Sequence, residues 1–206
     1  SGVDMHIQNT HFKGNFTNQD GATNGKACVD IRGTLARKSA RLFFVSCAFT
    51  KSELGINSNF DCQDVLITAS EFDILHRGVN LAEAADGSTG GQVTGPTGVL
   101  IEGNRFDNID AEGIFNHSNG GNPQGNIVAG NSFRDVGANS DDSADLPALN
   151  FEHGNNFAYG NYFHRTDVLS NFEGSIYHET PIRNTVTLDD NASTFRNAVD
   201  PITNAA

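Results

Sequence analysis

The sequence has no tryptophan, a single methionine and only three cysteines among its 206 residues. An odd number of cysteines without a Cys-x-x-Cys pair argues against both a zinc site and a disulfide framework. We therefore expect Cys28, Cys47 and Cys62 to be free thiols that serve as small apolar core residues.

Positive charge is also scarce, since 13 lysines and arginines face 25 aspartates and glutamates, for a formal net charge of −12. A nucleic-acid partner needs basic side chains that engage phosphate, and an anionic membrane surface attracts the same side chains. The chain also lacks a run of 18 apolar residues that could span a bilayer. The composition therefore predicts neither a nucleic-acid partner nor a membrane partner.

No segment shows the 3.6-residue apolar period of a helix, whereas glycine (22 residues) and asparagine are abundant. A short apolar segment that ends in phenylalanine recurs instead, at intervals of 23 to 37 residues. Most copies are followed by a second short apolar segment, such as "RGVNLAE" or "EGIFNHS". The copies end at Phe12, Phe49, Phe72, Phe106, Phe133, Phe163 and Phe195.

A repeat of this length, built from short strands, predicts a β-solenoid of about seven coils, because each coil buries its apolar face only against the next one. We expect the phenylalanines from Phe49 to Phe163 to form an internal stack. Asn104, Asn131 and Asn161, each two residues before a phenylalanine, are expected to form a hydrogen-bonded ladder. The expected organisation is one domain over residues 1–206, a fragment of a longer solenoid, with the last coil and a C-terminal cap at 186–206.

The repeat resembles the right-handed parallel β-helix of the pectin-lyase-like superfamily over nearly the whole chain. Within that superfamily, "DAEGIFNHS" (110–118) and "ALNFEHGNNFAYGNYF" (148–163) are similar, in the same order, to motifs of the alginate lyase and chondroitinase B group. Those motifs read E-x-E-I-I-x-x-K-S, L-R-H-G-N and G-N-x-F. The resemblance implies an all-β protein at an extracellular, periplasmic or virion-surface location.

The resemblance also implies a site for polysaccharide lysis by β-elimination. Asn80, Asp110 and Glu112 would hold Ca²⁺, a hard cation that takes carboxylate and amide oxygens and neutralises the carboxylates of an acidic polysaccharide. The implied catalytic residues are His117, which would take the C5 proton, Glu152 and His153. His117 stands where the family has lysine, and Glu152 stands where it has arginine.

The same residues also have structural interpretations. Asp110 and Glu112 are two residues apart, so in a strand they would share one face, and they would then face solvent there or at a corner. A corner at Asn116 would be needed to bring His117 to the same side. His153, followed by glycine, fits a turn.

Two functions therefore remain open on the sequence. One is a calcium-assisted lyase that acts on a uronate-containing polysaccharide. The other is a non-catalytic β-helical shaft or glycan-binding segment of a phage tail spike or surface adhesin, which would form a homotrimer if it belongs to a spike.

Overall fold

The computed structural model describes residues 4–14, 27–32, 41–59, 64–82, 97–117, 125–137, 148–151, 157–164, 176–178 and 186–188. Within these ranges all regular structure is β-strand, so they contain no helix that could cross a membrane. The strands are β1 (Met5–Gln8), β2 (His11–Lys13), β3 (Ala27–Arg32), β4 (Leu42–Val45), β5 (Ala48–Asn59), β6 (Val65–Thr68), β7 (Glu71–Ala82), β8 (Leu100–Glu102), β9 (Arg105–Ile109), β10 (Ile114–His117), β11 (Ile127–Ala129), β12 (Ser132–Val136), β13 (Leu149–Phe151), β14 (Phe157–Tyr159), β15 (Tyr162–His164), β16 (Ile176–His178) and β17 (Val186–Leu188).

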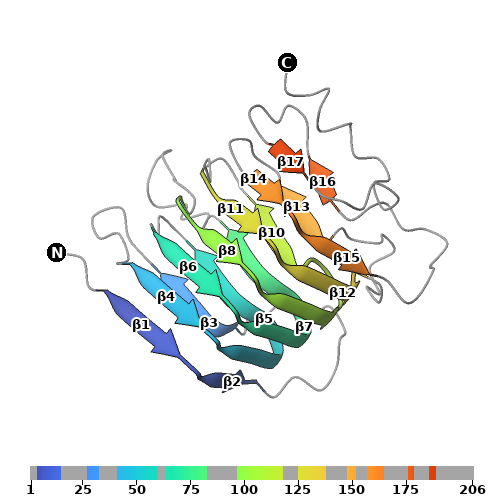
Figure 1. Cartoon of the computed structure of the whole chain (residues 1–206). Helices are drawn as coiled ribbons and strands as arrows, with labels where there is room; N and C mark the ends of the chain where they lie inside the picture. Colours follow the sequence, from blue (N-terminus) through green and yellow to red (C-terminus); the bar gives the residue numbers. More distant parts are fainter. Residues whose placement is uncertain are drawn as a thin grey trace, which may run out of the picture.

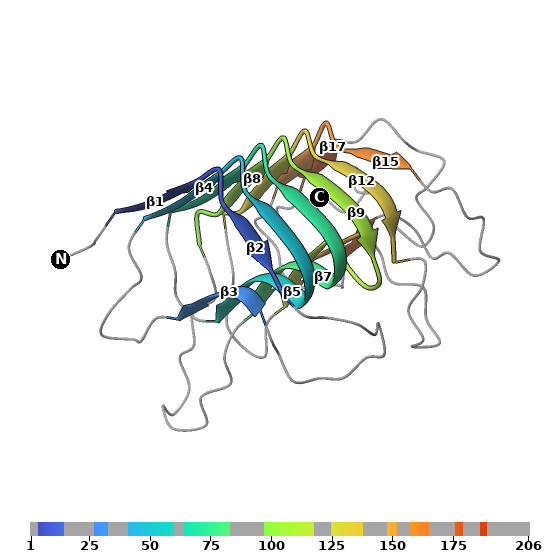
Figure 2. The same ribbon diagram turned by 90° about the horizontal axis from the view of Figure 1, so that it is seen from below.

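The strands form two parallel sheets, and the chain alternates between them (Figure 1). One sheet has the order β1-β4-β6-β8-β11-β14-β17, and the other follows β15-β12-β9-β7-β10-β13-β16, with β5 paired to β2, β3 and β7. Strands of successive repeats lie side by side, which Figure 2 shows from below. The predicted all-β class is confirmed, with parallel pairing throughout both sheets.

A stack of phenylalanines fills the interior between the sheets, as the repeat predicts. Ring centroids are 4.7 Å apart for Phe49 and Phe72, 4.6 Å for Phe72 and Phe106, and 4.8 Å for Phe106 and Phe133. All four side chains are buried. Stacking of the rings adds to the hydrophobic gain of burying each one. The side chain of Phe163, expected in the same stack, lies outside the described residues.

The predicted asparagine ladder is also confirmed. Asn104, Asn131 and Asn161 are buried, and each amide oxygen accepts a hydrogen bond from the backbone of the repeat before it. Each amide nitrogen also donates to a backbone carbonyl of that preceding repeat, at 2.9 to 3.0 Å. The ladder therefore satisfies backbone groups at a buried corner where strand pairing is interrupted.

A left-handed residue precedes each asparagine of this ladder, because the chain must turn sharply from one sheet to the other. Gly103, Gly130 and Gly160 have φ of 61°, 61° and 63°. Glycine carries no Cβ penalty in this conformation. Asparagine at this corner thus provides hydrogen bonds, while glycine provides the backbone freedom.

The expectation of buried free cysteines holds for Cys47, which is 3% exposed and unbridged. Cys28 is a free thiol but only half-buried. Burial raises the pKa of the Cys28 thiol. Cys62 lies outside the described residues.

Candidate functional site

The two acids that sequence analysis singled out lie in the connection between β9 and β10, and both are buried. Asp110 is 1% exposed and Glu112 is 2% exposed, so the expectation that these acids face solvent is wrong. The backbone amides of Asp110 and Ala111 donate to the carbonyls of Leu75 and His76, at 3.0 and 2.8 Å. Hydrogen bonding to β7 therefore continues past the end of β9 and holds this connection against the core.

Glu112 is part of a compact ion-pair cluster. Its Oε2 accepts a hydrogen bond from Nε of Arg77 at 2.6 Å, and its Oε1 accepts one from the amide nitrogen of Asn150 at 3.4 Å. The Arg77 guanidinium lies over the Phe115 ring, 4.7 Å from the centroid, which is a cation–π arrangement. Arg77 is 29% exposed, so one side of the cluster reaches the surface.

A row of amide and aromatic side chains crosses the sheet next to this cluster. Strand register aligns Asn57 with Asn80, Asn80 with Phe115, and Phe115 with Asn150. We call these four residues the amide row. At its end, Asn57 donates from Nδ2 to Asp30 at 3.2 Å, and Asn80 donates from Nδ2 to the Asn57 oxygen at 2.9 Å.

Two carboxylates set the direction of the amides in this row, because an ionised carboxylate only accepts hydrogen bonds. Asp30 requires the amide nitrogen of Asn57, which leaves the Asn57 oxygen for Asn80. Glu112 likewise requires the amide nitrogen of Asn150. The side-chain oxygens of Asn80 and Asn150 are therefore turned away from these partners, and neither has a hydrogen-bond donor among the described residues.

The residues implied as calcium ligands do not fit that ion as they are arranged. Both oxygens of Glu112 already accept hydrogen bonds, and one of the two donors is the positively charged guanidinium of Arg77. Asp110 lies beside Leu75, whereas Asn80 lies beside Phe115, several residues farther along β7. Within the described ranges, no group of three or more His, Cys, Asp or Glu side chains could hold a metal.

The implied catalytic residues fall at or beyond the limit of the described side chains. The backbone of His117 belongs to β10, which continues through Asn116 and pairs His117 with Ala82, so the corner expected at Asn116 is replaced by a continuous strand. The side chain of His117, and the whole of Glu152 and His153, lie outside the described residues.

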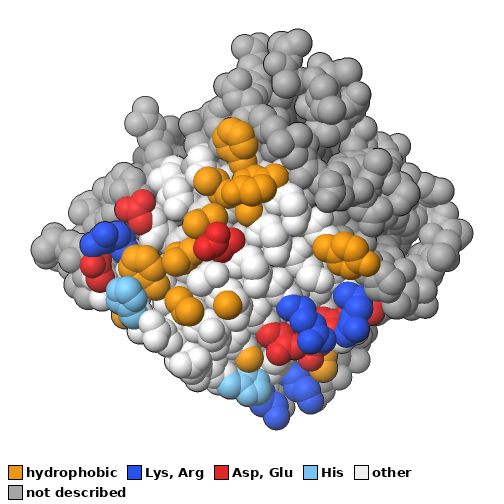
Figure 3. All heavy atoms as spheres, in the orientation of Figure 1, with side chains coloured by type: hydrophobic (Ala, Val, Ile, Leu, Met, Phe, Trp, Pro, Cys, Tyr) orange, Lys and Arg blue, Asp and Glu red, His pale blue; other side chains and the backbone are white. Residues whose placement is uncertain are grey.

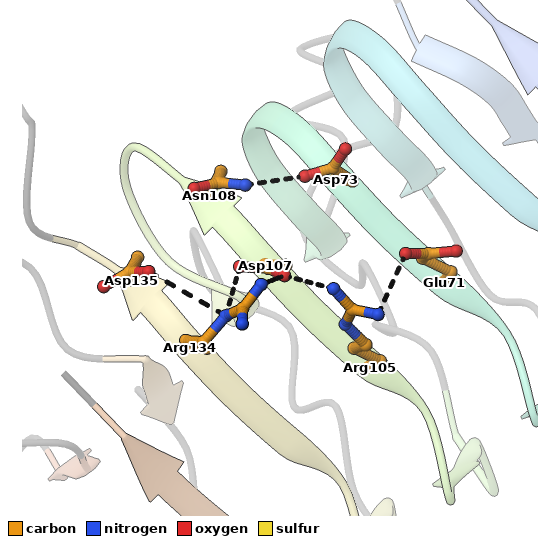
Figure 4. A network of polar contacts seen from close by, with 7 residues as sticks. All are labelled: Glu71, Asp73, Arg105, Asp107, Asn108, Arg134 and Asp135. Carbon is orange, nitrogen blue, oxygen red and sulfur yellow. Dashed lines mark hydrogen bonds and ion pairs between the residues drawn. The ribbon is translucent and has the colours of Figure 1, made fainter. Parts of the chain in front are cut away.

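A second polar cluster, which sequence analysis did not predict, covers the outer face of β7, β9 and β12 (Figure 4). Its centre is Asp107, 1% exposed, which accepts hydrogen bonds from Arg105 at 2.5 Å and from Arg134 at 2.9 Å. Arg105 also pairs with Glu71 at 3.5 Å. The two arginines occur at different offsets from the repeat phenylalanine, before Phe106 and after Phe133, which hid their convergence on one carboxylate.

The Asp107 cluster predicts a pH dependence of stability. Burial alone raises the pKa of the Asp107 carboxyl, but hydrogen bonds from Arg134 and Arg105 outweigh it and hold the pKa below its ordinary value. Because the folded pKa is lowered, Asp107 stabilises the fold above the unfolded value of about 3.9, and this contribution is lost as pH falls through the folded pKa.

We therefore expect Asp107→Asn to lower the free energy of unfolding at neutral pH by about 1 kcal/mol, since the half-exposed arginines are screened by water. The difference from wild type should shrink as the pH falls below about 4. Urea unfolding at neutral pH and at about pH 3 measures both values. A difference that stays constant across this range would contradict the assigned ion pairs.

Comparison of the chain with protein-family models, with curated proteins and with solved structures gave no match.

Proposed function

We propose that the two parallel sheets belong to a β-solenoid of the right-handed parallel β-helix type, as in the pectin-lyase-like superfamily. The proposal is supported by the alternation of the chain between the sheets and by the in-register stacking of phenylalanines from successive repeats. Such a rod presents the same side-chain row on successive strands, which suits it to a polymeric ligand.

We propose further that the chain binds a polysaccharide, without catalysis, over the amide row. The observation that carries this proposal is the pair of amide oxygens on Asn80 and Asn150, on either side of Phe115, that have no donor among the described residues. A buried acceptor without a donor costs about 1 to 3 kcal/mol, so a hydroxyl group that reaches it is favoured. Sugar hydroxyls supply such donors at regular intervals along a chain.

Arg77 supports the predicted preference for an acidic polysaccharide. Only its Nε is engaged with Glu112, and within the described part of the chain its two terminal amino groups donate no hydrogen bond. A guanidinium held by one carboxylate and one aromatic ring is preorganised to meet a second carboxylate. In this proposal Arg77 donates hydrogen bonds to a uronate carboxylate, while the amide oxygens of Asn80 and Asn150 accept hydrogen bonds from sugar hydroxyl groups.

Affinity electrophoresis in gels that contain alginate or chondroitin sulfate tests the proposal. We expect retardation of the wild type in at least one of these gels, in the absence of calcium. Phe115→Ala should weaken binding about tenfold, equal to about 1.4 kcal/mol. The matched control is Tyr162→Ala, which removes a 60% exposed ring that lies outside the amide row and should leave retardation unchanged. Equal migration of wild type and Phe115→Ala in both gels would overturn the proposal.

The lyase prediction is distinguished by a second measurement on the same polymers. Appearance of the ultraviolet absorbance of an unsaturated product, dependent on calcium and lost in Glu112→Ala, would establish the calcium-assisted lyase instead. We expect no such signal, and no rise in melting temperature with calcium, because Glu112 is already engaged with Arg77.

The surface or extracellular location and the spike homotrimer stay predictions; light scattering tests the trimer.

A further inference from the structure

The outer face of the seven-stranded sheet carries an apolar row that neither the fold nor the proposed site uses. The register aligns one outward side chain from each of five successive strands, β4, β6, β8, β11 and β14. All five are hydrophobic and at least partly exposed. We call Phe43, Leu66, Leu100, Ile127 and Phe157 the outer apolar row.

These strands are apolar on both faces. The residue after each member of the row points inward and is buried, as Phe44, Ile67 and Val128 are. In a sheet that is covered on both faces, the strand sequences are continuous runs of apolar residues. In a sheet with one solvent-exposed face, apolar and polar residues alternate along each strand. The sequences of β4 (LFFV) and β6 (VLIT) are of the first kind. The strand sequences thus fit a sheet whose outer face is covered by a partner.

Figure 3 shows hydrophobic side chains as a broken band across this face of the molecule. Phe157 is 44% exposed and Tyr159, two residues farther along β14, is 48% exposed, so two aromatic rings stand at one end of the row. Beside the row, on the described parts of β4, β6, β8, β11 and β14, Glu102 is the one charged outward side chain. The partner of this face is therefore uncharged where it touches the row.

A second copy of the chain does not suit this face. Seven strands at about 4.8 Å spacing and four residues of about 3.3 Å each give a face of about 30 by 13 Å, or about 400 Å². A stable protein interface takes about 800 Å² from each partner. The formal charge of −12 on each chain also opposes close approach of two copies, and it opposes an anionic lipid surface.

We propose that the outer apolar row binds an uncharged polysaccharide whose sugar rings lie flat along it. The C–H faces of pyranose rings are apolar, and they pack on aromatic and aliphatic side chains while the hydroxyls at the ring edges stay in water. A polymer that lies across the parallel strands repeats this contact from one strand to the next, so a narrow row gains affinity from length. A peptide strand is a poorer occupant, because it adds at a sheet edge and not on a face whose backbone is already paired.

Sedimentation with insoluble cellulose and with chitin tests this proposal. We expect wild type to sediment with at least one of them, and to do so equally at about 1 M salt, because the contact is not ionic. The double variant Phe157→Ala/Tyr159→Ala should reduce the bound fraction at least about tenfold. Tyr162→Ala is the matched control, since Tyr162 is 60% exposed but belongs to the other sheet, and its binding should equal that of wild type.

The double variant removes exposed rings, so its melting temperature should stay near that of wild type. Ile127→Lys tests the middle of the row independently and should also abolish sedimentation. Phe115→Ala, which tests the amide row, should leave sedimentation unchanged. The proposal for the amide row and the proposal for the outer apolar row are therefore tested independently. The proposal is overturned if wild type stays in the supernatant with both polymers, or if Tyr162→Ala loses as much binding as the double variant. A dimer in light scattering that the double variant dissociates would also overturn it, in favour of self-association.

Discussion

Replacement of Asn131 by alanine is expected to lower the free energy of unfolding by about 2 to 5 kcal/mol. The Asn131 oxygen accepts from the backbone amide of Asn104 at 2.9 Å, and its nitrogen donates to the carbonyl of Ile101 at 3.0 Å. Alanine removes both partners at once and leaves a buried donor and a buried acceptor unsatisfied. Urea unfolding followed by circular dichroism measures the loss.

The asparagine ladder suggests a control variant with an intermediate loss of stability. Ser70 occupies the equivalent place one repeat before Asn104, where its hydroxyl accepts from the backbone amide of Cys47 and donates to the carbonyl of Thr68. A hydroxyl therefore performs part of the amide's role, and Asn131→Ser should lose less stability than Asn131→Ala. Gln8→Ala, which removes an exposed amide from β1, should change stability by less than about 0.5 kcal/mol. Equal losses for the serine and alanine variants would show that cavity formation, and not hydrogen bonding, dominates.

The repeat could be predicted from the sequence because it depends on local spacing that recurs. The phenylalanine and the asparagine two residues before it appear in the same order in successive repeats, and side chains at equivalent positions of stacked strands must meet. The stack through Phe106 and the ladder through Asn131 follow from that rule alone.

The position of Asp110 and Glu112 could not be obtained in the same way. The two-residue spacing predicts a shared face only if both residues lie in one strand, and here β9 ends at Ile109 while β10 begins at Ile114. Burial of Glu112 depends on Arg77, which is 35 residues earlier. No local pattern marks that pairing, since it follows from which strands become neighbours.

The stacked glycines Gly78 and Gly113 are a second feature whose structural role depends on contacts between residues far apart in the sequence. Gly78 and Gly113 follow Arg77 and Glu112 directly, and a Cβ on Gly78 would come within 2.4 Å of the Gly113 carbonyl and 2.8 Å of the Phe106 ring. The glycines are visible in "RGVNLAE" and "EGIFNHS", but their purpose is not. They allow β7 and the connection before β10 to approach the phenylalanine stack closely, next to the Arg77–Glu112 ion pair.

Replacement of Arg77 by methionine is expected to destabilise the fold by about 2 to 4 kcal/mol, somewhat less than for a fully buried pair because water reaches Arg77. Methionine has an apolar side chain of similar length, but it removes the guanidinium that lies over Phe115 and leaves the buried Glu112 carboxylate without its cation. The double variant Arg77→Met/Glu112→Gln should recover most of this loss, since a neutral glutamine needs no counter-ion and can still accept from Asn150. A double-mutant cycle by urea unfolding gives the coupling free energy directly.

The double-mutant cycle also distinguishes a structural role of the Glu112 carboxylate from a role as a metal ligand. If its carboxylate is held in place for the fold, as the 2.6 Å contact with Arg77 indicates, the coupling is large and calcium changes none of the four melting temperatures. If Glu112 is instead a metal ligand that Arg77 only covers, Arg77→Met should bind calcium better than wild type and regain stability from it, because a ligand that binds only the folded state raises stability. Additive losses in the cycle, together with calcium-dependent stabilisation of Arg77→Met, would therefore reverse the assignment of this carboxylate from a structural group to a metal ligand.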